Sequence, residues 1–184
     1  MTTAVSHDMG TSPRGGIKPR EHAPELVVDL VGGGRWRLAE QHPETFTMVV
    51  FYRGLHCPVC RAQLSELNRR LDELTSRGIT VIAISADTSE RAKRTVDEWH
   101  LDRLPIGYGL NEETARAFGL FISQGISEDE PARFSEPGLF FTRPDGTVYY
   151  EAINSMPWGR PHLDDILGGI DYAAKADYPA RGEA

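Results

Sequence analysis

Two apolar, β-branched runs restrict the fold of this chain more than any other feature. The runs Phe46–Tyr52 (FTMVVFY) and Ile79–Ser85 (ITVIAIS) each predict a strand that is buried on both faces. Between them, apolar residues recur at helical spacing: Cys60, Leu64, Leu67, Leu71 and Leu74. A strand, a crossover helix and a second strand make a βαβ unit, so we expect the two strands to be parallel neighbours in one sheet.

Two hairpins flank this unit in the sequence. Residues 26–30 and 35–38 are joined by three consecutive glycines, and residues 139–142 and 147–153 are joined by an Arg-Pro-Asp-Gly turn. Residues 104–106 predict a short edge strand. Strands that belong to hairpins pair antiparallel, so the complete sheet must be mixed.

Three further helices are predicted. Asp87, with Glu90 three residues later, resembles a capping box, and Asn111 is a good N-cap for a short helix. Apolar residues at helical spacing predict the last helix over 163–170, whereas the polar stretch 123–136 predicts a long loop. We therefore predict an α/β fold with a mixed central β-sheet, helices on both faces and an N-terminal β-hairpin extension.

The chain has 184 residues, the size of a single domain, and we place that domain at 21–175 between flexible tails at 1–20 and 176–184. A net charge of −7, with no Lys/Arg run, argues against a dedicated nucleic-acid binder. No apolar run approaches the ~20 residues of a membrane-spanning helix. Because the N-terminal residues also lack the apolar segment of a secretory signal, we expect a cytoplasmic protein.

The two cysteines, Cys57 and Cys60, follow the first buried strand directly. The helical pattern begins near Cys57 or Pro58, and a thiol at a helix start faces unpaired backbone N–H groups and the positive end of the helix dipole. Both effects favour the thiolate and lower the pKa of the cysteine. Arg53 and His56 add cationic neighbours. The segment is therefore suited to nucleophilic sulfur chemistry.

The spacing of Cys57 and Cys60 places the two thiols about one helical turn apart, close enough to form a disulfide. One thiolate can then attack a peroxide or a substrate disulfide while the other resolves the product. A zinc site is disfavoured because the chain has no second Cys pair and its histidines are scattered, so we predict no metal. Because a thiol partner can supply the electrons for such chemistry, we expect no cofactor either. Two inert, buried cysteines are the remaining structural alternative.

From residue 22 to about residue 172 the chain resembles the alkyl hydroperoxide reductase/thiol-specific antioxidant family, the peroxiredoxin-like proteins of the thioredoxin superfamily. The resemblance includes the opening HAPEL, the strand-to-cysteine junction, ITVIAISADTSE after the first helix, and PGLFFTRPDGTVYY. It implies a thioredoxin-like fold and a thiol that reduces peroxides through a sulfenic acid and a disulfide. An external thiol reductant, such as a thioredoxin-type protein or a low-molecular-weight thiol, would restore the dithiol. Members of this family often form homodimers.

The site departs from the motif of that family, which is a Pro, three residues, a Thr or Ser, two residues and the peroxidatic Cys. Laid on this chain, the motif makes Cys60 peroxidatic, with Arg53 in place of the Pro and Cys57 in place of the Thr. The family's peroxide-binding Arg is also missing, because this chain has Pro137 there. Arg53 and Arg160 are the candidates to replace it.

Two alternatives stay open. In a thioredoxin-like thiol–disulfide oxidoreductase, Cys57 would be the exposed attacking thiolate and Cys60 the resolving thiol, and Pro137 resembles the cis-proline that faces the Cys pair in such folds. A cis Pro137 and an exposed Cys57 would favour this reading, whereas an arginine beside the Cys60 sulfur would favour the peroxidase. A redox-silent adaptor would instead keep its function in C57S and C60S.

Overall fold

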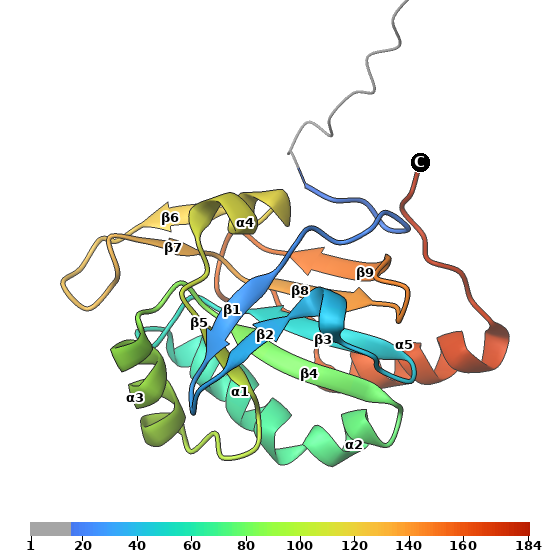
Figure 1. Cartoon of the computed structure of the whole chain (residues 1–184), viewed down its shortest axis with the longest axis horizontal. Coiled ribbons are helices and arrows are strands. Elements are labelled where there is room, and N and C mark those ends of the chain that lie inside the picture. The colour runs from blue at the N-terminus through green and yellow to red at the C-terminus, as the bar shows by residue number, and fades with distance from the viewer. Residues whose placement is uncertain (1–15) are drawn as a thin grey trace, which may run out of the picture.

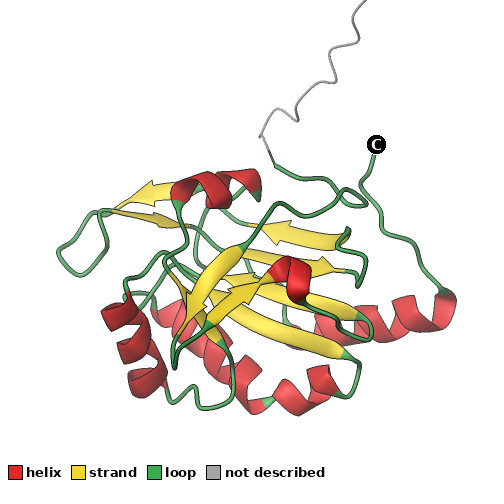
Figure 2. Cartoon of the chain, viewed as in Figure 1, coloured by secondary structure: helices red, strands yellow, loops and turns green. Residues whose placement is uncertain are grey.

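The computed structural model of the chain describes residues 16–184 (Figure 1). A seven-stranded sheet, in the order β2-β1-β5-β4-β3-β8-β9, forms the centre of the molecule. The strands of this sheet are β1 (Val27–Leu30), β2 (Arg35–Arg37), β3 (Phe46–Phe51), β4 (Ile79–Ile84), β5 (Ile106–Tyr108), β8 (Gly138–Thr142) and β9 (Val148–Ile153). The α-helices are α1 (Pro58–Arg69), α2 (Leu71–Thr75), α3 (Ser89–Trp99), α4 (Glu112–Ala117) and α5 (Leu163–Ala176), and one 3₁₀ turn covers Leu38–Glu40 (Figure 2).

The centre of the sheet is the predicted βαβ unit. Strands β3 and β4 pair parallel over six residues, from Phe46 opposite Ile79 to Phe51 opposite Ile84. Every residue of β3 is buried, as the unbroken apolar run predicts. Strand β8 pairs antiparallel with β3, and β9 pairs antiparallel with β8. The predicted mixed sheet is therefore confirmed, and its parallel strands end at the same edge.

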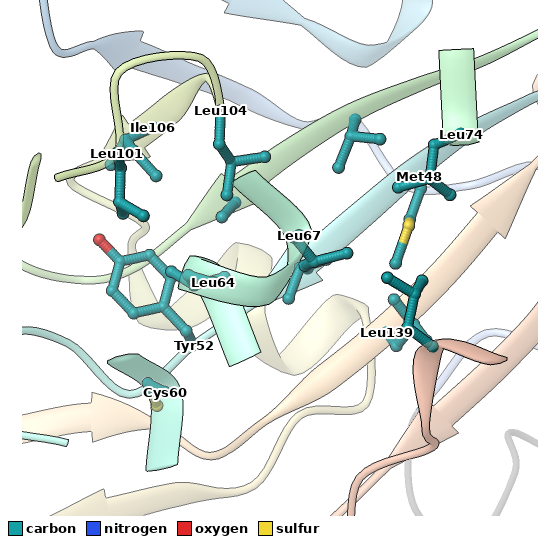
Figure 3. Packing of buried hydrophobic residues seen from close by; sticks show 14 of the residues in the cluster. Met48, Tyr52, Cys60, Leu64, Leu67, Leu74, Leu101, Leu104, Ile106 and Leu139 are labelled. Carbon is teal, nitrogen blue, oxygen red and sulfur yellow. The ribbon is translucent and has the colours of Figure 1, made fainter. Parts of the chain in front are cut away.

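Helices cover both faces of the sheet, as predicted, but unequally. Helices α1, α2, α3 and α5 lie on one face, and α4 lies on the other (Figure 1). Cys60 belongs to the larger apolar cluster, together with Tyr52 from the end of β3 and Leu64 from α1 (Figure 3). All three side chains are almost completely buried, so α1 is fixed to the sheet immediately beside the two cysteines.

The N-terminal hairpin β1–β2 is present as predicted, and the turn glycines Gly32, Gly33 and Gly34 all have positive φ angles. Its strand β1 pairs with β5, which in turn pairs with β4. The strand predicted at residues 104–106 as an edge strand therefore begins at Ile106 and is internal. The hairpin extension covers the edge that β5 would otherwise expose.

The prediction of a loop over residues 123–136 is wrong in part, because the segment contains a second, two-stranded sheet of β6 (Ile122–Gln124) and β7 (Arg133–Ser135). Its strands are only three residues long, and Phe134 is the one large apolar side chain that they bury. The alternation of apolar and polar residues in these two strands is therefore too weak to predict them. The β6–β7 hairpin is held by its contacts with the rest of the chain.

The predicted N-terminal tail, residues 1–20, lies outside the described residues up to position 15. Of the remainder, the Arg20 backbone N–H donates a hydrogen bond of 2.7 Å to the carbonyl of Val148 in β9, and the Tyr149 hydroxyl donates one of 2.9 Å to the carbonyl of Tyr178. Parts of both predicted tails thus contact the body of the protein. Within residues 16–184 no helix combines the length and the apolar character needed to cross a membrane.

Candidate active site

The candidate site lies at the turn between β3 and α1. The turn leaves the sheet after Tyr52, passes through Gly54 at φ +130°, and closes with a hydrogen bond of 3.1 Å from the Cys57 N–H to the Gly54 carbonyl. A residue with a side chain rarely adopts that φ, so the glycine permits the turn. Pro58 then occupies the first position of α1, which confirms that the helix begins at Cys57 or Pro58.

Cys57 is the N-cap of α1, and its sulfur accepts a hydrogen bond of 3.2 Å from the backbone N–H of Cys60. Both cysteines are free thiols, and the Cys60 thiol donates to the Cys57 sulfur at 2.7 Å. Only 1% of Cys57 and 0% of Cys60 is exposed to solvent. The spacing of the pair therefore does bring the two sulfurs into contact, and the fold keeps them out of bulk water.

The two thiols differ in acidity. The pKa of Cys57 is lowered to about 6, first by the hydrogen bond from the Cys60 thiol and then by the Cys60 backbone N–H and the guanidinium groups of Arg160 and Arg53. Burial and the hydrogen bond that it donates to Cys57 raise the pKa of Cys60 well above its usual value. Near neutral pH the pair therefore holds a thiolate on Cys57 and a proton on Cys60.

Arg160 supplies the nearest cation to the sulfurs. Its Nη2 atom lies 2.9 Å from the Cys60 sulfur and 4.0 Å from the Cys57 sulfur. The rest of the guanidinium is held by a hydrogen bond of 2.7 Å from Nε to the Pro157 carbonyl and by a contact of Nη1 with Gln63 on α1. Of the two arginines that the sequence offered, Arg160 is the one that contacts both sulfurs.

The sequence also named Arg53 and His56 as supporting residues, and the fold turns both toward the β6–β7 hairpin. Arg53 forms ion pairs with Glu136 at 3.2 Å and Glu130 at 3.6 Å, and its guanidinium lies 4.8 Å from the centre of the Phe134 ring. The His56 ring packs on Phe134 as well, and its Nε2 lies 4.0 Å from Glu130. Burial, followed by the charge of Arg53, lowers the pKa of His56.

Pro137 precedes Gly138, which pairs with Phe51, so it lies at the edge of the sheet where β3 ends. Every peptide bond among residues 16–184 is trans, so Pro137 is not the cis-proline that would favour the thiol–disulfide oxidoreductase. In the trans form the Pro137 carbonyl accepts a hydrogen bond of 3.0 Å from the Asn154 N–H, which extends the pairing of β8 with β9. The exposed Cys57 expected for a disulfide reductase is likewise absent from the described site.

A groove of about 240 Å³ lies between α1 and the segment that precedes α5, and it is lined by Arg160 but by neither cysteine. Arg160 and Gln63 form part of its wall, together with Val59 from the first turn of α1 and with Trp158, which is 69% exposed. Arg160 thus borders both the groove and the sulfurs. A small molecule in the groove can reach the guanidinium without unfolding the turn.

Sequence reasoning missed the role of Asp87. The residue does not cap α3: Thr88 does so, with its hydroxyl accepting a hydrogen bond of 3.4 Å from the Arg91 N–H. Asp87 instead accepts a hydrogen bond of 2.8 Å from the backbone N–H of Leu55, in the turn that leads to the cysteines. Its position directly after a buried parallel strand was the available signal, because side chains there meet at one edge of the sheet.

The fold and the paired thiols define a thioredoxin-like protein with a dithiol at the start of a helix. The model of the AhpC/TSA family matches residues 19–151. The chain belongs to that family, and it is thereby a peroxiredoxin-like, thiol-dependent peroxidase, which is an oxidoreductase. No curated protein matches it significantly in sequence.

Solved structures of peroxiredoxins share the fold. A peroxiredoxin-like protein from Aquifex aeolicus superposes with a TM-score of 0.69 at 17% identity, over 88% of this chain and 90% of the other. Peroxidoxin BcpB from Mycobacterium tuberculosis gives 0.69 at 15% identity, over 85% and 97% of the two chains. Xanthomonas campestris peroxiredoxin Q gives 0.65 at 21% identity, over 81% and 91%. Likenesses at such low identity establish the fold alone.

Proposed function

We propose that the chain reduces hydrogen peroxide or alkyl hydroperoxides with Cys57 and Cys60 as its redox couple. The observation that carries this proposal is the contact of the Arg160 guanidinium with a pair of buried, touching sulfurs. A peroxide is small enough to reach such sulfurs, whereas a protein disulfide needs an exposed thiolate. The burial of Cys57 and the trans Pro137 therefore favour the peroxidase over the thiol–disulfide oxidoreductase.

The distribution of protons supports Cys57 as the thiol that reacts first. Its thiolate attacks one peroxide oxygen, an S–O bond forms as the O–O bond breaks, and the other oxygen leaves as water or an alcohol after taking up a proton. Arg160, within 4.0 Å of both sulfurs, can donate hydrogen bonds to the oxygen on which negative charge develops. The thiol of Cys60 then attacks the sulfenic sulfur of Cys57, a disulfide forms, and a second water leaves.

The oxidised pair needs two electrons and two protons to return to the dithiol. We propose that an external thiol supplies them, either a thioredoxin-type protein or a low-molecular-weight thiol, and that the chain works in the reducing cytoplasm. Because both cysteines are buried in the reduced protein, a protein reductant can reach the sulfurs only if part of the surrounding chain moves.

Single-turnover oxidation of two cysteine variants tests the proposal. Reduced C60S treated with one equivalent of hydrogen peroxide should gain one oxygen on Cys57, seen as a sulfenic acid by intact mass and by labelling with a 1,3-diketone probe. Reduced C57S should react far more slowly, because its remaining thiol has a raised pKa. Rapid oxidation of Cys60 in C57S would move the first step to Cys60, the position that the family motif indicates. Sluggish oxidation of the wild type and of both variants would overturn the function.

A further inference from the structure

Asp87 is a buried carboxylate directly behind the turn that carries the thiol pair. It follows β4, and its side chain is fully shielded from solvent. One carboxylate oxygen accepts a hydrogen bond of 2.8 Å from the Leu55 N–H, and the other accepts one of 2.7 Å from the guanidinium of Arg91. Both oxygens thus have partners, one of them in the turn before Cys57.

The contact with the turn is close on the side of Gly54 as well. A side-chain carbon added to Gly54 would lie only 2.8 Å from the Asp87 carboxylate. The glycine therefore permits the positive φ and also leaves room for this carboxylate. Because the turn closes with the hydrogen bond from Cys57 to Gly54, the position of Gly54 and Leu55 fixes where Cys57 enters α1.

Asp87 is not needed to begin its own helix, since Thr88 caps α3. Asp87 instead pairs with Arg91, and the Arg91 guanidinium also donates a hydrogen bond of 3.1 Å to the Asp129 carbonyl in the β6–β7 connection. Arg91 therefore links the carboxylate to that connection. The carboxylate therefore joins the turn of the thiol pair to the hairpin that covers Arg53 and His56.

We propose that Asp87 is a positioning residue for the peroxidase reaction: its carboxylate holds the Leu55 N–H and so keeps the Cys57 sulfur in the N-cap position of α1. The expected effect of Asp87 on peroxide reduction rests on the proposed function, whereas its effect on the position and acidity of Cys57 does not. Without the acceptor, the partly buried Leu55 N–H loses its partner and the turn shifts to find another. Cys57 then loses alignment with the Cys60 N–H, and less of it is thiolate at neutral pH.

Three variants separate positioning from general stability. D87A removes the acceptor, D87N keeps an oxygen that can accept from Leu55, and T88A weakens the start of α3 without touching the turn. The pH profile of Cys57 alkylation by iodoacetamide, followed by peptide mass spectrometry on the reduced protein, reports the thiolate. For D87A we expect the midpoint to rise by about one pH unit, with a roughly tenfold slower peroxide reaction at pH 5, below both midpoints. D87N should stay within threefold of the wild type, and T88A should melt earlier with an unchanged profile.

The proposal is overturned if folded D87A keeps the wild-type profile, or if T88A shifts it equally. Should D87A fail to fold, D87E moves the acceptor away from Leu55 while keeping the charge, and it should show the same upward shift; a wild-type profile for D87E would also overturn the proposal. The alkylation measurement needs no peroxide. A shifted profile in a protein that does not reduce peroxide would therefore support the role of Asp87 and reject the proposed function.

Discussion

Arg160 Nη2 lies 2.9 Å from the sulfur of Cys60, although the two residues are 100 positions apart in the sequence. Arg160 comes after residue 151, where the match to the family model ends, and it belongs to the segment between β9 and α5. The position before β8 that would hold the peroxide-binding arginine is Pro137. A guanidinium from another segment thus lies beside the sulfurs.

Replacing Arg160 tests whether this guanidinium acts in the reaction. R160Q removes a positive charge that lowers the pKa of Cys57, together with hydrogen bonds available to the leaving oxygen, so we expect the rate with hydrogen peroxide at pH 7 to fall on the order of 100-fold. R160K keeps the charge but not the planar donor geometry and should be intermediate. Stopped-flow tryptophan fluorescence gives the rates.

R61Q is the matched control for R160Q, because Arg61 is an exposed arginine on the first turns of α1. Its rate should stay within about twofold of the wild type, since screening weakens the effect of an exposed charge. Equal losses in R61Q and R160Q would mean that only net charge matters. An unchanged rate in R160Q would exclude the guanidinium from the reaction.

The acidity of Cys57 predicts a definite pH dependence. The rate of its alkylation by iodoacetamide follows the thiolate fraction, so for the reduced protein it should increase as the pH rises from 5, reach half its maximum near pH 6, and level off above pH 7. In C60A the hydrogen bond from the Cys60 thiol is lost, and the midpoint should move upward. A wild-type midpoint above pH 8 would show that Cys57 is an ordinary thiol.

Asn68, on α1, should contribute to stability without taking part in the chemistry. Its buried side-chain oxygen accepts hydrogen bonds from the N–H groups of Arg103 at 3.0 Å and Leu104 at 2.9 Å, and its amide donates to Asp102 at 2.8 Å. N68L leaves two backbone N–H groups unpaired, so the free energy of unfolding should fall by about 2 to 4 kcal/mol in urea titrations.

N68D alone would place a second carboxylate against Asp102, so the matched control is the double variant N68D/D102N, which keeps the accepting oxygens and reverses the donor and acceptor. It should lose much less stability than N68L. The peroxide rate of folded N68L should match that of the wild type, because Asn68 lies near the far end of α1 from the cysteines. A loss below about 0.5 kcal/mol in N68L would show that water replaces these bonds at little cost.

The parts of the fold that the sequence predicted are those determined by local or strongly periodic patterns. The buried run of β3 needs no partner to be recognised, and the Asn111 side chain does accept a hydrogen bond of 2.7 Å from the Thr114 N–H at the start of α4. The β6–β7 hairpin was missed because distant charges hold it: Arg133 pairs with Glu112 on α4, and Glu130 pairs with Arg53. The paired residues are far apart in the sequence, so a local sequence pattern does not reveal the hairpin.

The same division applies to the site. The hydrogen bonds that Cys57 makes as N-cap lie within residues 54–60, and the helix start could be predicted from the strand-to-helix junction. The choice of Arg160 over Arg53 could not, because it depends on the packing of the segment before α5 against α1. Asp87 and Thr88 are both good caps by residue type, and only the distant N–H of Leu55 explains why Asp87 has another role.

The second-order rate of the reduced protein with hydrogen peroxide distinguishes a peroxidase from a thiol–disulfide oxidoreductase. It would be followed by tryptophan fluorescence and thiol titration, beside C57S, C60S and a model disulfide substrate. We predict a rate above roughly 10⁴ M⁻¹s⁻¹ for the wild type, a similar first oxidation in C60S, and a large loss in C57S. A slow reaction with peroxide together with ready reduction of the model disulfide would contradict the proposed peroxidase function. The protein would then be a thioredoxin-like reductase.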